Sequence, residues 1–260
     1  MAIPKALILV QLVFGVFAAA WGVWASADTA QAGVLQQSAG PFARTVWDGV
    51  YTAEQAARGK AGYTTYCSEC HEDSLEGGRG RPLVGATFWR DWGEDSLDGL
   101  FNIMRTAMPR DNPASLTDNQ YLDIVAYILQ VNGLPAGTAE LTPGLTSKIQ
   151  VVGKDGPGPM PSFALVQVVG CLAAGKDNTW MLVNAGNPFR VRNPKPLSDV
   201  ADLQNLPLGT GTFRILSPNA AQLSPDAGHK VLIKGFLVRA PNDDRLNFTS
   251  VTVLTPACAP

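Results

Sequence analysis

The segment Cys67-Ser68-Glu69-Cys70-His71 decides the fold of the first part of the chain. It places two thiols three positions apart and an imidazole directly after the second thiol. Upstream, Thr52 followed by Gln55 at the third position has the form of a capping box, which predicts that a helix begins there. Small and apolar residues recur at helical spacing from this cap onward, so the helix is expected to run directly into the two cysteines.

Thiol pairs with this spacing occur in three kinds of site. A thioredoxin-like redox pair needs a strand before the cysteines, whereas a helix is predicted here. A zinc site needs two more ligands, and the remaining Cys171, Cys258 and His229 are distant and have no paired spacing. In c-type haem attachment, two thiols add to the two vinyl groups of one porphyrin while the adjacent His71 reaches the iron. The sequence favours haem, with the redox pair and the zinc site as alternatives.

Two further helices are predicted downstream. Apolar residues within 97–104 recur at i, i+3, i+4 and i+7 and predict a helix that ends near Ala107. A second capping box, Thr117 with Gln120, predicts a third helix that ends at Gly133.

With these elements in this order, residues 50–133 resemble the class I monohaem cytochromes c. The resemblance rests on a helix with Gly59 and Tyr63 before the thiol pair, the segment Arg81-Pro82-Leu83-Val84-Gly85 after it, the pair Met108-Pro109, and a closing helix with Tyr127. The segment is similar in particular to the cytochrome modules that accompany bacterial quinoprotein dehydrogenases. The resemblance implies an all-α cytochrome c domain with one iron-containing haem c, attached covalently through Cys67 and Cys70.

The resemblance also implies a role for Pro82. Its backbone carbonyl is expected to accept a hydrogen bond from the His71 ring and so to fix the orientation of this iron ligand. Trp89 and Trp92 are candidate walls of the haem pocket, with ordinary core packing as the alternative. Three arginines are candidate partners of the haem propionates, with solvated loop positions as the alternative: Arg79, Arg81 and Arg90.

Met108 is expected to be the second axial ligand of the iron. It lies just past a predicted helix end, and Pro109 biases it toward an extended backbone, so its thioether projects from a loop. The alternative is a loop residue that fills a gap in the core. Core packing explains Met104 better, and His229 lies in a Gly-His-Lys turn far along the chain. A thioether ligand favours ferrous iron and raises the reduction potential.

The composition changes at residue 134. Residues 134–161 are rich in Gly, Pro, Thr and Ser and are predicted to be a linker. Short strand-like runs follow within 162–260, at 165–172, 180–184, 212–216, 230–238 and 246–254. Five short strands predict a small all-β domain, either an OB-like barrel or a sandwich. The predicted fold class is therefore α+β, with an all-α cytochrome c domain followed by a small all-β domain.

Cys171 and Cys258 lie at the start of the first predicted strand and past the last one. After export they are expected to form a disulfide that closes one end of the barrel, with two free buried thiols as the alternative. The β domain resembles small exported OB-like modules at residues 168–172 and 246–251. Its expected role is docking or stabilisation.

The N-terminus has the form of an export signal. Lys5 precedes an apolar run over residues 6–25, and Ala25-Ser26-Ala27 is a small-x-small cleavage pattern, so residues 1–27 are predicted to be a signal peptide. Retention as an inner-membrane anchor is the alternative, because the run is just long enough to cross a bilayer. Residues 28–49 are predicted to be flexible, and the expected location is the periplasm.

Charge and composition narrow the classes of function. The chain of 260 residues is 46% apolar and 16% charged, with a net charge of −2. This composition argues against wholesale disorder, a polytopic membrane protein and a nucleic-acid binder, which usually carries a basic excess. Residues 51–133 carry seven Lys and Arg against twelve Asp and Glu, whereas residues 160–260 carry nine against six. An acidic carrier domain favours partners with a basic docking patch.

The expected function is one-electron transfer rather than enzymatic catalysis, because His71 and Met108 together leave no open position on the iron. The expected electron donor is a dehydrogenase, and the chain could itself be the cytochrome subunit of that enzyme. The expected electron acceptor is another cytochrome or an oxidase. The alternatives are a haem-based sensor or enzyme with an open sixth position, and an extracellular binding module that acts through the β domain.

Overall fold

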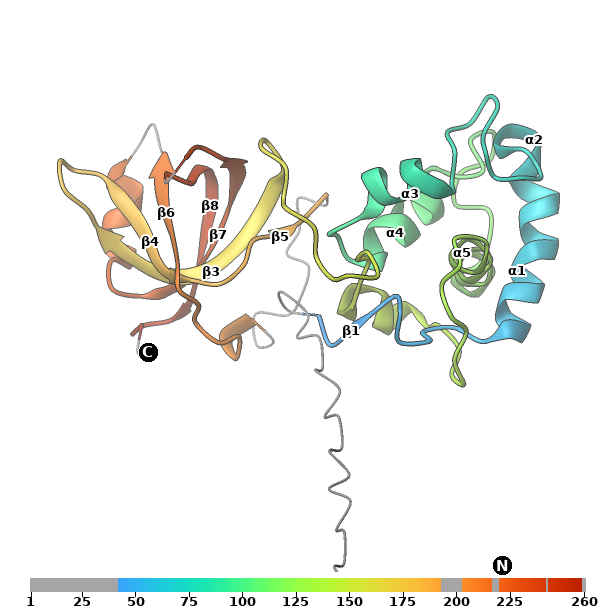
Figure 1. Cartoon of the computed structure of the whole chain (residues 1–260), viewed down its shortest axis with the longest axis horizontal. Coiled ribbons are helices and arrows are strands. Elements are labelled where there is room, and N and C mark those ends of the chain that lie inside the picture. Colours follow the sequence, from blue (N-terminus) through green and yellow to red (C-terminus); the bar gives the residue numbers. More distant parts are fainter. Residues whose placement is uncertain (1–41, 193–202, 217–219, 242, 259–260) are drawn as a thin grey trace, which may run out of the picture. The chain divides into compact units, whose positions relative to one another are not determined.

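Apart from one two-residue strand that precedes them, the α-helices come first along the chain and the other strands follow (Figure 1). The computed structural model describes residues 42–192, 203–216, 220–241 and 243–258. The α-helices of this part are α1 (Ala53–Tyr66), α2 (Ser68–His71), α3 (Gly85–Trp92), α4 (Leu97–Ala107) and α5 (Asp118–Val131). The three predicted helices coincide with α1, α4 and α5. The helix α3 was not predicted from the sequence.

The helix starts follow from the capping residues of the sequence. The Thr52 hydroxyl accepts a hydrogen bond from the Gln55 backbone N–H at 3.1 Å, and Thr117 and Gln120 form a complete capping box on α5. An N-cap hydroxyl satisfies one of the backbone donors that the first helical turn leaves unpaired. The Gln55 side chain bonds both the N–H and the carbonyl of Leu141. It therefore joins α1 to a distant segment.

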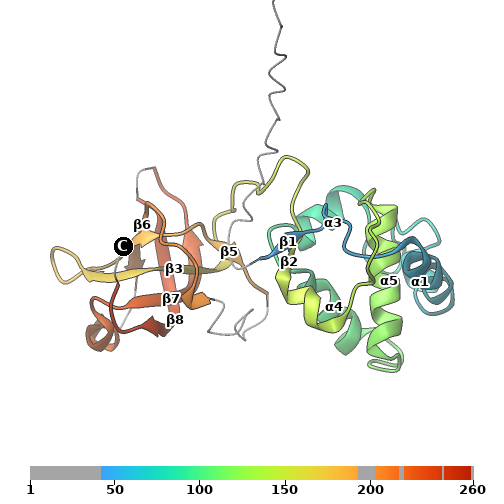
Figure 2. The ribbon, with the colours of Figure 1, turned by 90° about the horizontal axis from the view of Figure 1, so that it is seen from below.

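The helices α1 and α5 pack closely against each other (Figures 1 and 2). Gly59 permits this approach, because a Cβ atom at this position would lie 1.7 Å from the Asp123 carbonyl oxygen. Tyr63 of α1 and Tyr127 of α5 meet with their ring centroids 5.4 Å apart. Large side chains on both helices are thereby withdrawn from water, which stabilises the helical core.

Two segments that were expected to be flexible or linking contribute to this core. The strand β1 (Arg44–Thr45) pairs in parallel with β2 (Ile149–Gln150), and Figure 2 shows the two side by side. The 3-10 helix η1 (Pro143–Lys148) leads directly into β2. Several apolar side chains in these segments are buried: Val46, Leu134, Leu141, Ile149 and Val151. Residues 42–49 and 134–151 are therefore packed against the helical core, whereas the sequence predicted a flexible segment and a linker. These apolar residues stand alone within polar stretches, but they are buried. The predicted domain boundaries stay a prediction.

The strands of the second part form one sheet with a returning order. They are β3 (Leu165–Ala174), β4 (Trp180–Ala185), β5 (Phe189–Arg190), β6 (Gly211–Leu216), β7 (Lys230–Val238) and β8 (Arg245–Thr255). The pairings lead from β3 through β4, β6, β8 and β7 back to β3. All of these pairings are antiparallel except that of β6 with β8, which is parallel. The crossover between β6 and β8 contains the 3-10 helix η2 (Ala220–Asp226) and β7.

The five predicted runs coincide with five of these strands, and each strand supplies residues to a buried core. The core cluster includes Val166, Val168, Leu182, Ile233 and Leu246. The strand β5 was not predicted, because two residues are too few to display the alternation that identifies a strand. It pairs with β3 in antiparallel orientation.

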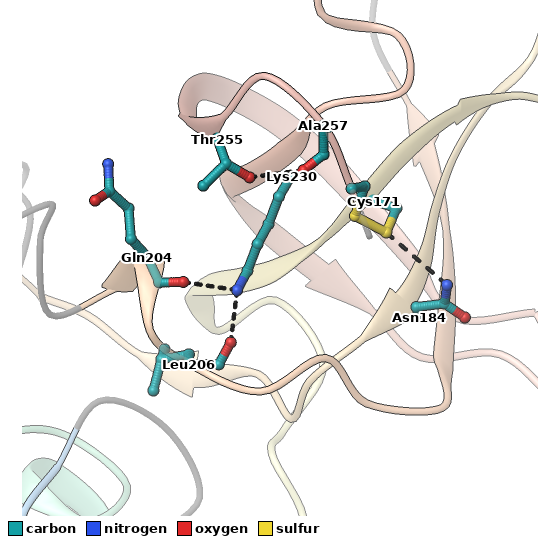
Figure 3. Close-up of a disulfide and its surroundings, with 8 residues drawn as sticks. Cys171, Asn184, Gln204, Leu206, Lys230, Thr255 and Ala257 are labelled. Carbon is teal, nitrogen blue, oxygen red and sulfur yellow. Dashed lines mark hydrogen bonds between the residues drawn. A yellow bond between two sulfur atoms is a disulfide. The ribbon is translucent and has the colours of Figure 1, made fainter. Parts of the chain in front are cut away.

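A disulfide joins Cys171 of β3 to Cys258 after β8 (Figure 3), which confirms the predicted pairing. The two Cα atoms lie 5.6 Å apart, although 87 positions separate the residues in the sequence. The side-chain amide of Asn184 donates to the Cys171 sulfur at 3.9 Å. Nearby, the Lys230 ammonium donates to the Gln204 carbonyl at 2.8 Å. The disulfide ties the end of the described chain to β3.

The predicted signal peptide, its anchor alternative and the first part of the predicted flexible segment lie outside the described residues. The part of the chain that the structure describes contains no helix long and apolar enough to cross a bilayer. All described residues fall within one compact unit, Gln36–Pro260.

Candidate haem site

The two thiols lie where α1 meets α2. Cys67 ends α1, its N–H donates to the Tyr63 carbonyl at 2.8 Å, and it also caps the start of α2. The N–H groups of Cys70 and His71 both donate to the Cys67 carbonyl, at 3.2 and 3.0 Å. Side chains three and four positions apart on a helical turn share one face. The turn therefore presents two thiols and one imidazole on the same side.

Both cysteines of the motif are free and half-buried. Burial, followed by the nearby Cys70, raises the pKa of the Cys67 thiol to about 11. A thiol with a raised pKa stays protonated at neutral pH and is not an activated nucleophile. This property does not suit a thiol–disulfide exchange enzyme, and α1 rather than a strand precedes the pair.

The imidazole of His71 is oriented by a backbone carbonyl. Its Nδ1 atom lies 2.7 Å from the carbonyl oxygen of Arg81. Because a carbonyl only accepts, Nδ1 carries the proton in this contact and Nε2 keeps its lone pair for a metal. The expected acceptor was the carbonyl of Pro82, and the structure corrects this by one residue. Pro82 still matters, because a proline restricts the residue before it to extended backbone.

Gly80 lies against the other side of this contact. A Cβ atom there would lie 2.7 Å from both Nδ1 and Cε1 of His71. The Gly80 N–H donates to the Cys70 carbonyl at 2.6 Å, and the Gly77 N–H donates to the His71 carbonyl at 3.1 Å. The loop is thus bonded back onto α2, next to the ring. Sequence reasoning missed Gly80, although a glycine directly before Arg81-Pro82 was a signal for it.

Asn132 is a second residue that sequence reasoning missed. Its side-chain amide donates to the Leu83 carbonyl at 3.0 Å and to the Ile128 carbonyl at 2.8 Å. Its Oδ1 atom accepts from the Gly85 N–H at 3.1 Å. The end of α5 therefore holds the segment that follows the His71 acceptor.

Met108 caps the end of α4 in an extended conformation, with φ −127° and ψ 153°. Its carbonyl accepts a hydrogen bond from the Tyr121 hydroxyl at 2.6 Å, and its peptide bond to Pro109 is cis. Its side chain is half-buried, whereas Met104 is 8% exposed and belongs to the helical core. Met108 thus lies past a helix end on extended backbone, which is the position the sequence predicts.

The other histidine belongs to the β part. His229 precedes β7, and its Nδ1 atom lies 3.9 Å from an Asp226 carboxylate oxygen. The backbone carbonyl of His229 accepts from the Leu172 N–H at 3.0 Å. Cys171 and Cys258 are consumed by their disulfide. The disulfide therefore removes Cys171 and Cys258 as further ligands for a zinc site at Cys67 and Cys70.

The tryptophans and arginines near the motif have protein partners. Trp89 stacks on Trp47 with centroids 6.3 Å apart and planes 5° from parallel, and Trp92 lies under the Arg192 guanidinium at 5.3 Å. The three candidate propionate partners form ion pairs: Arg79 with Glu69, and Arg81 and Arg90 with Asp91. Propionate groups would have to compete with these carboxylates.

The donor set fits a covalently held haem. Two free thiols at the required spacing lie beside an imidazole whose Nδ1 donates to a carbonyl and whose Nε2 is available. Metal-ligating histidines commonly donate their other ring N–H in this way, because the bond fixes the tautomer and the ring orientation.

Comparison with known protein families agrees with this geometry. A family model described as cytochrome C oxidase, cbb3-type, subunit III matches residues 54–128. Searches of curated proteins and of solved structures give no significant match. The matched range begins in α1, contains the thiol pair and ends within α5. Residues 54–128 therefore form a c-type cytochrome domain, and the chain carries covalently attached haem c with its iron.

Proposed function

We propose that this protein is an exported one-electron carrier with His71 and Met108 as the axial ligands of its haem. The observation that carries the proposal is the His71 ring, held by the Arg81 carbonyl beside two free thiols. The bound haem c supplies a metal centre that gains and loses a single electron. The protein side chains attach this group, ligate it and set its potential.

Each site residue has a separate task in this proposal. Cys67 and Cys70 would hold the porphyrin covalently, and His71 would bind the iron through Nε2. Met108 would supply a second, soft and neutral thioether ligand, which would favour ferrous iron and raise the reduction potential. The hydrogen bond from Tyr121 to the Met108 carbonyl holds the backbone of this ligand. With His71 and Met108 both as ligands, the protein would leave the iron no open position for substrate, which suits electron transfer.

Acidic residues around α2 support docking to a basic partner. Glu69, Glu72, Asp73 and Glu76 are exposed next to the thiol pair. Opposite charges steer association, and salt screens that attraction, so electron transfer should slow as ionic strength rises. We propose a dehydrogenase as the donor and a cytochrome or an oxidase as the acceptor. The matched family model, which is described as an oxidase subunit, favours an oxidase.

Export to the periplasm is supported by two features of the chain. The disulfide between Cys171 and Cys258 belongs to a class of bond that persists in oxidising compartments and is rare in the cytosol. The N-terminal sequence has the form of a signal peptide or an anchor. We therefore propose a periplasmic protein, either free or anchored to the inner membrane.

The β part is proposed to be an OB-like barrel that stabilises or docks the cytochrome domain. The support is its strand order, in which pairings return from β7 to β3 after passing through β4, β6 and β8. A ring of paired strands leaves no open edge among its members, which protects the sheet from pairing with other chains.

The test of the proposed function compares Met108→Ala with Met104→Leu in the haem-loaded protein. Loss of the thioether in Met108→Ala should abolish the weak sulfur-to-iron band of the ferric form. The reduced variant should then bind carbon monoxide, which the original protein should not bind. Met104→Leu is the control, because Met104 lies in the core and the substitution keeps its volume nearly constant. An unchanged band in Met108→Ala, or carbon monoxide binding by the original protein, contradicts the proposal.

A further inference from the structure

The His71 ring is the first member of a chain of contacts that leads to α3. The ring Nδ1 atom lies 2.7 Å from the Arg81 carbonyl oxygen. The Arg81 guanidinium in turn lies 2.6 Å from Oδ2 of Asp91, which is on α3. The other carboxylate oxygen of Asp91 accepts from Arg90 Nε at 3.0 Å. One residue, Arg81, therefore contacts the imidazole through its backbone and α3 through its side chain.

The ion pair of Arg81 differs from the other arginine pair of the same loop. The two arginine side chains are similarly exposed, 71% for Arg81 and 68% for Arg79, but Asp91 is 15% exposed whereas Glu69, the partner of Arg79, is 88% exposed. Exposed ion pairs contribute little, because water and salt screen them and two long side chains must be ordered. A carboxylate that is mostly withdrawn from water and fixed on a helix gives Arg81 a better-defined anchor. The loop that carries the acceptor is thus tied to α3 at Arg81.

We propose that Arg81 and Asp91 are positioning residues for the iron ligand. Asp91 fixes the Arg81 guanidinium, which fixes the Arg81 backbone, whose carbonyl accepts a hydrogen bond from the His71 Nδ1–H. This inference rests on the proposed function, in which His71 binds iron through Nε2. A well-placed acceptor makes the imidazole a stronger donor to the metal, which stabilises ferric iron and lowers the reduction potential.

Gly80 makes the ring sensitive to this anchor. Its backbone lies so close to the His71 ring that an added Cβ would contact two ring atoms at 2.7 Å. The ring therefore cannot follow a displaced carbonyl toward Gly80. If the Arg81 backbone moves, the hydrogen bond between His71 Nδ1 and the Arg81 carbonyl therefore lengthens, because the ring cannot turn to restore it.

The decisive variant is Arg81→Met, studied in the full-length, haem-loaded protein. Loss of one positive charge near the iron would by itself favour ferric iron and lower the potential. Loss of the anchor weakens the hydrogen bond to His71 and raises the potential. The two effects have opposite signs, and we expect a rise. We also expect the Nδ1 proton of His71 to exchange with solvent faster, as measured by NMR of the haem-loaded protein.

The matched control is Arg79→Met, which removes the same charge from the same loop but breaks only the exposed pair with Glu69. Its potential should fall slightly or stay constant, and its Nδ1 proton exchange should not change. Asp91→Asn should accelerate this exchange as Arg81→Met does. The double variant should add little, because both substitutions break one contact.

The inference is overturned if Arg81→Met lowers the potential as Arg79→Met does and leaves proton exchange unchanged. If Arg81→Met does not accumulate, the exchange rate of the His71 Nδ1 proton in Asp91→Asn is the deciding measurement. An unchanged exchange rate in that variant refutes the inference. Failure of the proposed function itself looks different. In that case the original protein would lack attached haem, or its iron would not be bound by His71.

Discussion

Gly80 illustrates, at the scale of one residue, how a missing side chain positions the imidazole of His71. The ring of His71 occupies the space in which a Cβ of residue 80 would lie. The Gly80 N–H meanwhile donates to the Cys70 carbonyl, so the backbone cannot easily withdraw. The position therefore requires glycine because of space.

Gly80→Ala should displace the His71 ring and weaken its hydrogen bond to the Arg81 carbonyl. Haem should still be attached, because Cys67 and Cys70 are unchanged, but the midpoint potential should rise. Redox titration of the haem-loaded variant measures this shift. Gly78→Ala is the control, since its Cβ would meet only the end of the exposed Glu72 side chain. Equal potentials in both variants would argue against the steric role of Gly80.

The proposed iron ligand could be predicted from the sequence more readily than the group that orients it. Cys67, Cys70 and His71 act through their side chains, and the amino-acid sequence gives the identity of each side chain directly. The acceptor is a backbone carbonyl, which every residue has, and the structure assigns it to Arg81 instead of Pro82. The role of Asn132 was missed for a related reason, because its partners are backbone groups of a segment distant in sequence.

At the scale of the element, two glycines of α1 show how closely α1 and α5 can approach each other. Gly59 and Gly62 both face α5, but their surroundings differ. A Cβ at Gly59 would collide with the backbone of Asp123 at 1.7 Å, whereas one at Gly62 would meet the flexible side chain of Ile124 at 3.2 Å. Backbone cannot yield without separating the helices, while a side chain can adopt another rotamer.

Gly59→Ala should therefore destabilise the protein by at least about 3 kcal/mol, the upper range for overpacking in a core. Gly62→Ala should be close to neutral, since alanine favours a helix by about 1 kcal/mol over glycine and offsets a small steric cost. Chemical denaturation followed by circular dichroism measures both. Similar losses in the two variants would show that the α1–α5 distance is not set at Gly59.

With the exception of the eight-residue helix α3, the long elements were predicted from the sequence and the short ones were not. The caps and apolar stripes of α1, α4 and α5, and the runs of β3, β4, β6, β7 and β8, extend over enough residues to show a period. The two-residue strands β1, β2 and β5 have no period to detect. They exist because distant residues pair, as Thr45 does with Gln150.

At the scale of the whole molecule, residues far apart in the sequence meet at Asp95. This carboxylate precedes α4, is 1% exposed, and lies 3.2 Å from Nε of Arg192, which follows β5. The backbone N–H of Arg190 also donates to the Glu94 carbonyl at 3.2 Å. Burial, the main cause, raises the pKa of Asp95 to about 6, and the hydrogen bond from the Ser96 N–H and the nearby arginines offset this rise only in part.

The raised pKa predicts the pH dependence of stability. In the folded protein the Asp95 carboxyl is protonated below about pH 6. In the unfolded chain its pKa has the ordinary value of 3.8, so it takes up the proton only at lower pH. This group therefore makes the free energy of unfolding larger as pH falls from 7 toward 4. Asp95→Asn should flatten that slope, as measured by denaturation at several pH values. Asp73→Asn, an exposed change, should retain the slope, and a steep slope in Asp95→Asn would contradict the assignment.

The hydrogen bond between the Trp47 indole N–H and the Val152 carbonyl spans 105 positions of the sequence. Export threads a chain through the membrane from its N-terminus, so both thiols reach the far side well before Val152 does. Strand β1 cannot pair before β2 has also been exported, so the helical core is not fully packed until then. In the export that we propose, the machinery that joins porphyrin to protein therefore meets the thiols on a nascent, still accessible chain.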